Sequence, residues 1–132
     1  MLALQGCNLF LAQPRPFVKD ETYYGTGTTL LPGDHPRKIL LAFSVKDGKP
    51  VWRYPQIGDA ESWGGTLTTA GVLVFFGDDA GSLEAVEATI GRALWHSYTG
   101  QRMHAWPMTY SADDTQYVFI AAGSDGFTFA LP

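Results

Sequence analysis

The sequence has one cysteine, few cationic residues and no long apolar run, and each shortage excludes a class of protein. Cys7 has no second cysteine, so an internal disulfide and a Cys-x-x-Cys-His haem attachment are both excluded. Nine Lys and Arg against thirteen Asp and Glu give a net charge of −4, which does not favour nucleic acid or an anionic membrane as a partner. No stretch reaches the about 18 apolar residues that a membrane span needs. Residues 1–11 lack a basic start and a cleavage site, so we expect a strand there and no signal peptide.

Sustained helical periodicity is also missing, and we therefore predict an all-β chain of one small domain. Fifteen glycines, eight prolines and 14% aromatic residues suit short strands joined by tight turns. We expect turns at Lys46–Lys49, where Asp-Gly would supply two positive φ angles, and at the acidic pairs Asp78-Asp79 and Asp113-Asp114. We expect strands within residues 2–11 (with a break at residue 6), 23–31, 39–45, 51–54, 71–76, 81–86, 105–110, 116–122 and 127–131, and loops at 13–20, 31–36, 55–62 and 96–100.

An internal repeat organises these strands. The segment from Ala42 to Trp52 aligns with the segment from Ala85 to Trp95 at an offset of 85 − 42 = 43 residues. The positions that coincide are Ala42 with Ala85, Gly48 with Gly91, and Trp52 with Trp95. Residues 126–131 also align with residues 81–86, at an offset of 126 − 81 = 45. A period of about 40–50 residues built of short strands is typical of a four-stranded propeller blade.

Each repeated residue has a physical role in such a blade. The alanine leaves room for a packed neighbour, and the glycine permits the turn of the hairpin. The tryptophan can bury a large apolar area between two blades while its N–H donates to a backbone carbonyl. We therefore expect Trp52 and Trp95 to be structural docking residues.

The repeat resembles the tryptophan-docking motif A-x-D-x-x-T-G-x-x-x-W of the quinoprotein alcohol dehydrogenases. These enzymes are eight-bladed propellers that bind pyrroloquinoline quinone (PQQ). The chain departs from the motif, since Ser44 and Glu87 stand at its Asp position and Asp47 and Ile90 at its Thr position. These departures weaken single turns and leave the period unchanged.

The resemblance covers nearly the whole chain and is most specific in the second half. Residues 62–77, 107–110, 116–118, 121–123 and 129–131, together with Trp95, are similar to the end of that family's catalytic propeller. Residues 23–25 and 32–33 are similar to the segment that precedes it. The resemblance implies a partial β-propeller of about two to three blades. We divide it into an incomplete blade and loop (1–36), a blade hairpin with its docking tryptophan (37–62), a second repeat (63–99) and a terminal repeat (100–132).

The family resemblance also implies a function. The parent enzyme would be a periplasmic oxidoreductase that oxidises a primary or secondary alcohol with PQQ and a Ca or lanthanide ion. Within this chain Trp63, Gly64 and Gly65 would contact the cofactor, because an indole offers a flat wall and glycine lets the main chain approach. The alternative is that Trp63 is a packed aromatic and the two glycines form a bulge or turn. Trp106 stands where the family usually has a small residue.

Nothing in the chain resembles the family's catalytic Asp or its metal ligands, so we expect the chain alone to be inactive. Residues 25–29 lack the Lys of a phosphate loop, and the turn at Ser124 is no nucleophile elbow. His35, His96 and His104 show no metal-ligand spacing. The expected partners are the remaining blades or a second copy of the chain. Two alternatives are a non-catalytic propeller scaffold of the outer-membrane assembly type, which binds proteins, and a decayed gene fragment.

Overall fold

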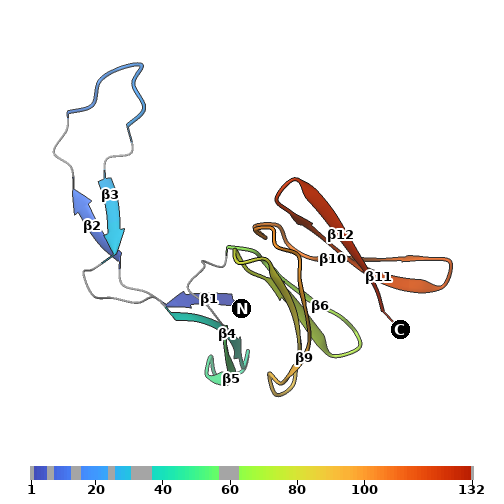
Figure 1. Ribbon diagram of the computed structural model, residues 1–132. Helices are drawn as coiled ribbons and strands as arrows, with labels where there is room; N and C mark the ends of the chain where they lie inside the picture. The colour runs from blue at the N-terminus through green and yellow to red at the C-terminus, as the bar shows by residue number, and fades with distance from the viewer. Residues whose placement is uncertain are drawn as a thin grey trace.

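The computed structural model describes residues 2–5, 8–12, 16–23, 26–30, 37–56 and 63–131, and these residues form strands and loops without a helix (Figure 1). The predicted all-β class is therefore confirmed. In chain order the strands are β1 (Leu2–Gln5), β2 (Asn8–Ala12), β3 (Thr26–Leu30), β4 (Arg37–Phe43), β5 (Pro50–Pro55), β6 (Thr66–Thr68), β7 (Leu73–Gly77), β8 (Ser82–Glu87), β9 (Ala93–Tyr98), β10 (Met108–Ala112), β11 (Thr115–Ala122) and β12 (Asp125–Ala130).

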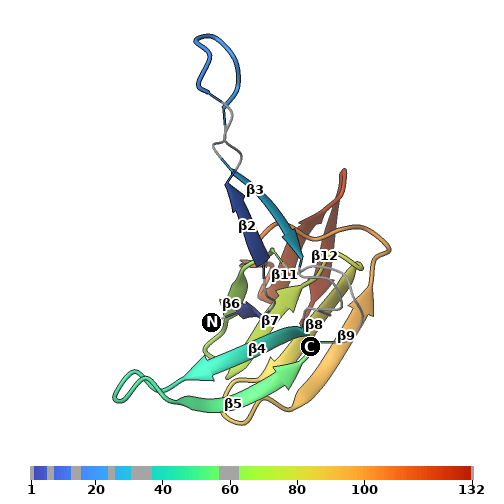
Figure 2. The ribbon, with the colours of Figure 1, turned by 90° about the vertical axis from the view of Figure 1, so that its left-hand side faces the viewer.

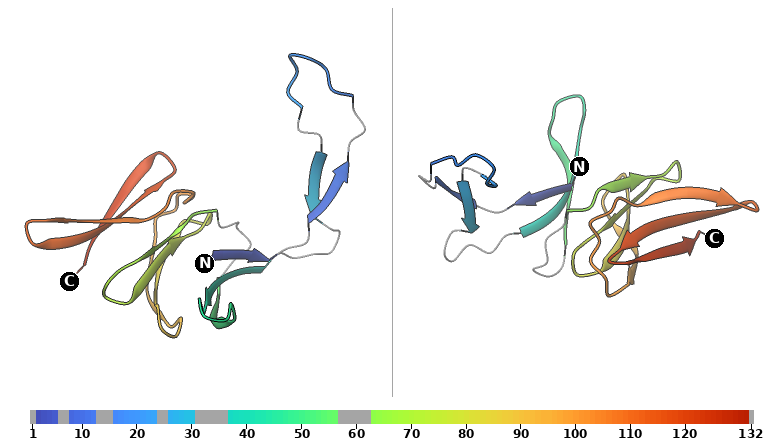
Figure 3. Two further views of the ribbon diagram at one scale, coloured as in Figure 1. Left: turned by 180° about the vertical axis from the view of Figure 1, so that it is seen from behind. Right: turned by 90° about the horizontal axis from the view of Figure 1, so that it is seen from above.

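The strands form antiparallel sheets that follow one another like the blades of a propeller. A four-stranded sheet in the order β6-β7-β8-β9 lies between the sheet β1-β4-β5 and the sheet β10-β11-β12 (Figures 1 and 3). The pair β2-β3 forms a separate ribbon that projects away from these three sheets (Figure 2). The arrangement is a partial β-propeller, as the sequence predicts.

The central sheet is buried on both faces, which explains why β7 is a continuous apolar run and not an alternating one. Val74 and Phe76 point to one face, where they form a core with Leu40 of β4. Phe75 points to the other face and packs with Val118 of β11. Side chains of neighbouring strand residues leave on opposite sides, so a strand between two sheets must be apolar at every position.

A further core joins the central sheet to the last one. Leu83 of β8, Ile120 of β11 and Met103 of the preceding loop are fully buried against one another. Gly77, at the end of β7, allows this contact, because a Cβ at that position would lie 2.6 Å from the Met103 sulfur. The loop before β10 is thereby fixed against the central sheet.

The 43-residue repeat is reproduced in the backbone geometry. Ala42 lies opposite Trp52 across β4 and β5, and Ala85 lies opposite Trp95 across β8 and β9, with a register shift directly after each alanine. The two hairpin turns share their hydrogen bonds, since the amides of Gly48 and Gly91 each donate to the carbonyl four residues earlier, at 2.9 and 2.8 Å. The repeat inferred from the sequence is confirmed.

Some local expectations were wrong. Asp47 does not share the positive φ of Gly48, so the hairpin turn has one left-handed residue and not two. The polar segment after Trp95 continues as strand to Tyr98, because β9 is held by its pairing with β8. Residues 105–107 precede β10 and are not part of a strand, and residues 66–68 form the unpredicted β6. The turn expected at 123–126 is shorter, since β12 already begins at Asp125.

Candidate functional site

The segment Trp63-Gly64-Gly65 leads directly into β6 at one end of the central sheet. The Trp63 side chain is 64% exposed among the residues described. The two glycines, by contrast, face the chain itself. A Cβ on Gly64 would lie 3.0 Å from the carbonyl oxygen of Ala105, and one on Gly65 would lie 2.5 Å from the Trp106 ring. Close packing against residues 103–106 therefore requires glycine at both positions.

The loop that covers these glycines, residues 102–107, exposes a basic, an imidazole and an indole side chain to solvent. Met103 and Pro107 are buried and Ala105 is half-buried, whereas the residue before Met103 and the two other residues up to Pro107 are exposed. These exposed residues are Arg102, His104 and Trp106. Trp106 is 74% exposed although one side of its indole lies against Gly65. An apolar ring with one face supported and most of its surface in water is a candidate contact for a planar ligand.

His104 is held in place by an acidic neighbour. Its Nε2 atom lies 3.0 Å from Oδ2 of Asp79, in the turn between β7 and β8. Oδ1 of Asp79 is buried and has no hydrogen-bond partner among the described residues. In the described part of the chain the imidazole is the partner of the Asp79 carboxylate, and this contact orients the ring.

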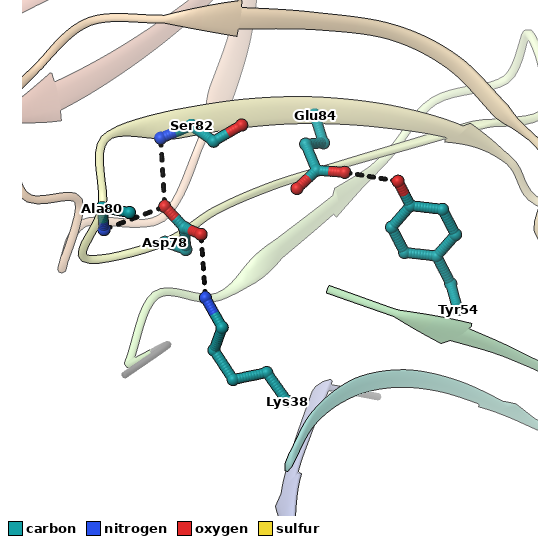
Figure 4. A network of polar contacts seen from close by, with 6 residues as sticks. All are labelled: Lys38, Tyr54, Asp78, Ala80, Ser82 and Glu84. Atoms are coloured by element: carbon teal, nitrogen blue, oxygen red, sulfur yellow. Dashed lines mark hydrogen bonds and ion pairs between the residues drawn. The ribbon is translucent and has the colours of Figure 1, made fainter. Parts of the chain in front are cut away.

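The adjoining residue of the same turn forms a buried ion pair with another sheet. Lys38 of β4 and Asp78 are 5% and 2% exposed, and Nζ lies 2.9 Å from Oδ2 (Figure 4). The other Asp78 oxygen accepts hydrogen bonds from the amides of Ala80 and Ser82, each at 3.0 Å. Every charge in the pair is thus matched, and the pair ties the β1-β4-β5 sheet to the central sheet. The prediction that Asp78 serves its own turn is confirmed, but the sequence analysis missed its ion pair.

A second polar contact between the same sheets involves Tyr54 of β5 and Glu84 of β8. The phenol donates a hydrogen bond of 2.6 Å to Oε2 of the carboxylate (Figure 4). Burial of the phenol, the hydrogen bond and the negative charge of Glu84 together raise the pKa of Tyr54 to about 12. The tyrosine is therefore a neutral hydrogen-bond donor across the physiological pH range.

The two predicted docking tryptophans have different surroundings. The Trp52 ring lies against Gly91, and its Nε1 donates a 2.8 Å hydrogen bond to the carbonyl of Ala88. Trp95 contacts Phe129 of β12 edge to face, with 5.1 Å between the ring centroids, and is 40% exposed. Each indole thus touches the next sheet along the chain. The assignment of these residues as docking residues remains a prediction.

Two of the cavities formed by the described residues lie beside the central sheet, and Trp63 lines neither of these two. One of about 510 Å³ lies between Tyr54 and the β8–β9 strands. The other, of about 560 Å³, lies between β9 and β12 and is lined mainly by apolar side chains.

The remaining sequence candidates form no site within the described ranges. No group of three or more His, Cys, Asp or Glu residues there could hold a metal ion. His96 lies exposed on β9, residues 26–29 belong to strand β3, and His35 lies outside the described residues. Within the same part of the chain no helix is suited to crossing a membrane.

The sequence analysis missed the two sheet-to-sheet polar contacts and the position of Trp106 over Gly65. Lys38 and Asp78 are 40 residues apart, and Tyr54 and Glu84 are 30 apart, so no local pattern marks either pair. For Trp106, the sequence offered one indication: the resembled family usually has a small residue at this position.

Comparison with known proteins gives consistent matches. Residues 55–118 match the family described as the PQQ glucose, ethanol and alcohol dehydrogenase β-propeller domain. The chain is similar to the quinoprotein alcohol dehydrogenase PedH of Pseudomonas putida, with 36% identity over 111 residues, which are 83% of this chain and 18% of the relative. The chain therefore spans less than one fifth of that relative's length.

Solved structures agree with this result. The quinohaemoprotein alcohol dehydrogenase ADHIIG of Pseudomonas putida aligns with a TM-score of 0.75 and 29% identity, over 96% of this chain and 20% of that one. A europium-containing methanol dehydrogenase aligns with a TM-score of 0.81 over 96% of this chain and 22% of its own, and its 24% identity shows the fold alone. BamB of Moraxella catarrhalis, with a TM-score of 0.54 and 20% identity over 98% of this chain and 35% of its own, likewise shows the fold alone.

Proposed function

Residues 55–118 of this chain belong to the β-propeller family of the PQQ-dependent glucose, ethanol and alcohol dehydrogenases, and from this membership we propose that the chain supplies one edge of a quinone-binding site. The observation that carries the proposal is the exposed indole of Trp63, which leads into β6 in the matched region. An indole at the end of a sheet, open to solvent, is suited to stack on a planar cofactor.

Among the described residues, the Trp63 indole is suited to contact the flat ring of PQQ. Gly64 and Gly65 contribute only indirectly, through the loop that they contact. PQQ is flat and carries several carboxylates, so it needs an apolar wall and donors or cations around it. Trp63 offers the wall. Gly64 and Gly65 are in contact with residues 103–106, so they support the loop that borders the wall. Their predicted role in direct contact with the cofactor remains a prediction.

When bound, PQQ would supply the electron acceptor for the oxidation of an alcohol. The part played by this chain would be to orient the cofactor plane through Trp63 and to shield that plane from water. The described residues present no cluster for Ca²⁺ or a lanthanide ion. We propose that the metal, the catalytic base and the alcohol site belong to other blades of a larger periplasmic protein. We further propose that the chain divides at residues 36, 62 and 99 into successive blade units.

Cofactor binding tests the proposed function. Saturation-transfer NMR on the PQQ ring protons, at micromolar protein, detects weak binding without any turnover. We expect the wild-type chain to bind with a dissociation constant of about 1 mM or below, since a single stacked ring contributes about 1–3 kcal/mol and charge contacts add to it. Trp63→Ala should weaken binding about tenfold. Absence of any transfer to PQQ would overturn the proposal.

A second experiment concerns activity. The chain mixed with PQQ, Ca²⁺, ethanol and a dye acceptor should show no dye reduction above the protein-free control, because under this proposal the catalytic base and the metal ligands belong to other blades. Sustained dye reduction would contradict the view that the chain forms only an edge of the site. The scaffold and gene-fragment alternatives predict no PQQ binding, so the NMR experiment separates them from the proposal.

A further inference from the structure

We propose that two copies of this chain associate head to tail, so that the outer face of the β10-β11-β12 sheet of one copy packs on the outer face of the β1-β4-β5 sheet of the other. These two faces lie at opposite ends of the row of three sheets (Figure 3). The inference goes beyond the proposed function, because neither face includes Trp63 or needs a quinone.

The outer face of the β10-β11-β12 sheet, which we call the last face, carries Tyr110, Tyr117, Phe119 and Ala130. Val118 is buried against the central sheet, so its neighbours Tyr117 and Phe119 leave β11 on the opposite side. The rings of Tyr110 and Tyr117 stack there with 5.2 Å between their centroids, and Ala130 is paired with Tyr117 across the strands. Tyr110 is 41% exposed, so this aromatic surface is open to a partner.

The outer face of the β1-β4-β5 sheet, which we call the first face, carries Ile39, Phe43 and Arg53. Leu40 and Tyr54 pack toward the central sheet, so the residues that alternate with them along β4 and β5 leave on the other side. Phe43 is 38% exposed on this face, and Arg53 is exposed as well. The first face is thus also open, with an aromatic and a cationic side chain.

The last face is the repeat equivalent of a face that is covered in the central sheet. Ala85 pairs with Phe75 in the central sheet as Ala130 pairs with Tyr117 in the last sheet. In the central sheet these two residues are 3% and 2% exposed, because the last sheet packs on them through Val118. A further sheet placed over Ala130 would therefore repeat a contact that the chain already makes.

The first face is the repeat equivalent of the opposite face of the central sheet. Phe43 corresponds to Val86 at the offset of 43 residues, and Val86 is fully buried in a core with Leu40 of the preceding sheet. Each contact between sheets thus joins one face of each kind. A single copy leaves one face of each kind open, so a second copy supplies the complement of both.

Charge favours contact between unlike faces over contact between like faces. Residues 103–131 contain three Asp and no Lys or Arg. Residues 37–55 contain five Lys and Arg against one Asp, and Lys38 among them is already neutralised by Asp78. Two last faces would bring acidic sheets together and two first faces basic ones, whereas the head-to-tail contact joins opposite charges.

The contact joins two different surfaces, so blocking one face of a copy leaves its other face usable. Phe43→Glu blocks the first face and Ala130→Glu blocks the last face, because the new carboxylate would have to leave water in the contact. Sedimentation velocity over a range of concentrations measures the association. The wild-type chain should associate, and each variant alone should require a concentration about tenfold higher or more.

An equimolar mixture of the two variants should restore association in a limited form. The Phe43→Glu chain keeps its last face and the Ala130→Glu chain keeps its first face, so one chain of each kind should form a complex of twice the mass of one chain. No larger species should appear, because both remaining faces of that complex carry the blocking carboxylate.

Two matched controls place the same side chain away from the two faces. Ile90→Glu and Ala70→Glu lie in exposed turns of the central sheet and should associate as the wild type does. Circular dichroism checks that every variant is folded. The milder pair Phe43→Ser and Ala130→Gln should give the same pattern if a glutamate variant unfolds.

Three results would overturn the proposal. They are a wild-type chain that stays monomeric at every concentration, a glutamate variant that associates by itself as strongly as the wild type, and a mixture that forms no complex while the wild type associates. The second result would mean that like faces pair. Failure of PQQ binding would leave the head-to-tail contact standing, since the two measurements are independent.

Discussion

At the scale of single residues, the contacts between sheets depend on a few matched polar groups. Lys38 and Asp78 are both buried, and each would be an uncompensated charge without the other. Removing one member of a buried pair costs more than the pair itself contributes, because the remaining charge stays out of water.

The first prediction concerns this pair. Lys38→Met should lower the free energy of unfolding by about 3 kcal/mol, since Asp78 would keep its two amide donors and lose its cation. Urea denaturation followed by circular dichroism measures the loss. The control is Lys49→Met, which removes an exposed lysine 3.7 Å from Asp47 and should have no measurable effect. Equal stability of the two variants would contradict the structural role of the buried pair.

The second prediction concerns Tyr54. Its pKa is raised from 10.0 to about 12, so the folded state favours the neutral phenol. The stabilisation from this residue is therefore complete below pH 10 and is lost as the pH rises toward about 12. The difference in urea midpoint between the wild type and Tyr54→Phe should be constant below pH 10 and shrink above it. A difference independent of pH across this range would show that folding does not raise the pKa of Tyr54.

At the scale of elements, the two hairpin turns that contain Gly48 and Gly91 have the same hydrogen bond and the same glycine position. They differ in what surrounds the glycine. Both glycines have positive φ, at +67° and +71°. A Cβ added at Gly48 would have no described neighbour within 4 Å. A Cβ added at Gly91 would lie 2.5 Å from the Trp52 ring. The hairpin at Gly91 therefore joins two sheets, whereas a methyl group at Gly48 would meet open space among the described residues.

This pair of turns gives the third prediction. Gly48→Ala should cost about 1 kcal/mol for the left-handed conformation alone. Gly91→Ala should cost a further about 1–3 kcal/mol, because the new methyl group displaces the Trp52 ring. In a Trp52→Ala background the two glycine substitutions should have equal effects on thermal unfolding. A persistent difference in that background would place the cost outside the Trp52 contact.

At the scale of the whole molecule, the three packed sheets leave large surfaces uncovered. The four-stranded sheet is covered on both faces, but the outer sheets each have one face without a neighbour in the described part of the chain. Large apolar side chains are exposed there and on the outer strand β9, among them Val51, Met108 and Tyr98. Exposed apolar surface and unpaired strand edges favour association with further β-structure.

The fourth prediction follows from these surfaces. The isolated chain should self-associate, so its sedimentation coefficient should rise with protein concentration. The change Met108→Lys, which places a charge on the exposed side of β10, should reduce the association. A monomer whose sedimentation is independent of concentration and whose melting temperature is high would contradict this expectation.

Much of the fold could be predicted because its signals are local. Turn residues bound the strands, and the alanine, glycine and tryptophan at matching positions mark a repeat of hairpins. Strand β9 was underestimated because its last residues are polar, and its pairing with β8 outweighs that local preference. The predicted site segment was found by its indole and glycines, but its neighbours come from a loop about 40 residues away, which sequence spacing does not reveal.

The sequence by itself determined most of the strands, the turns and the blade period, because the spacing of apolar and turn residues along the chain fixes them. Only the tertiary structure decided that Lys38 meets Asp78, that Tyr54 meets Glu84, and that Trp106 lies over Gly65. These contacts join residues far apart in the chain, and packing of one sheet on the next sets their partners and distances.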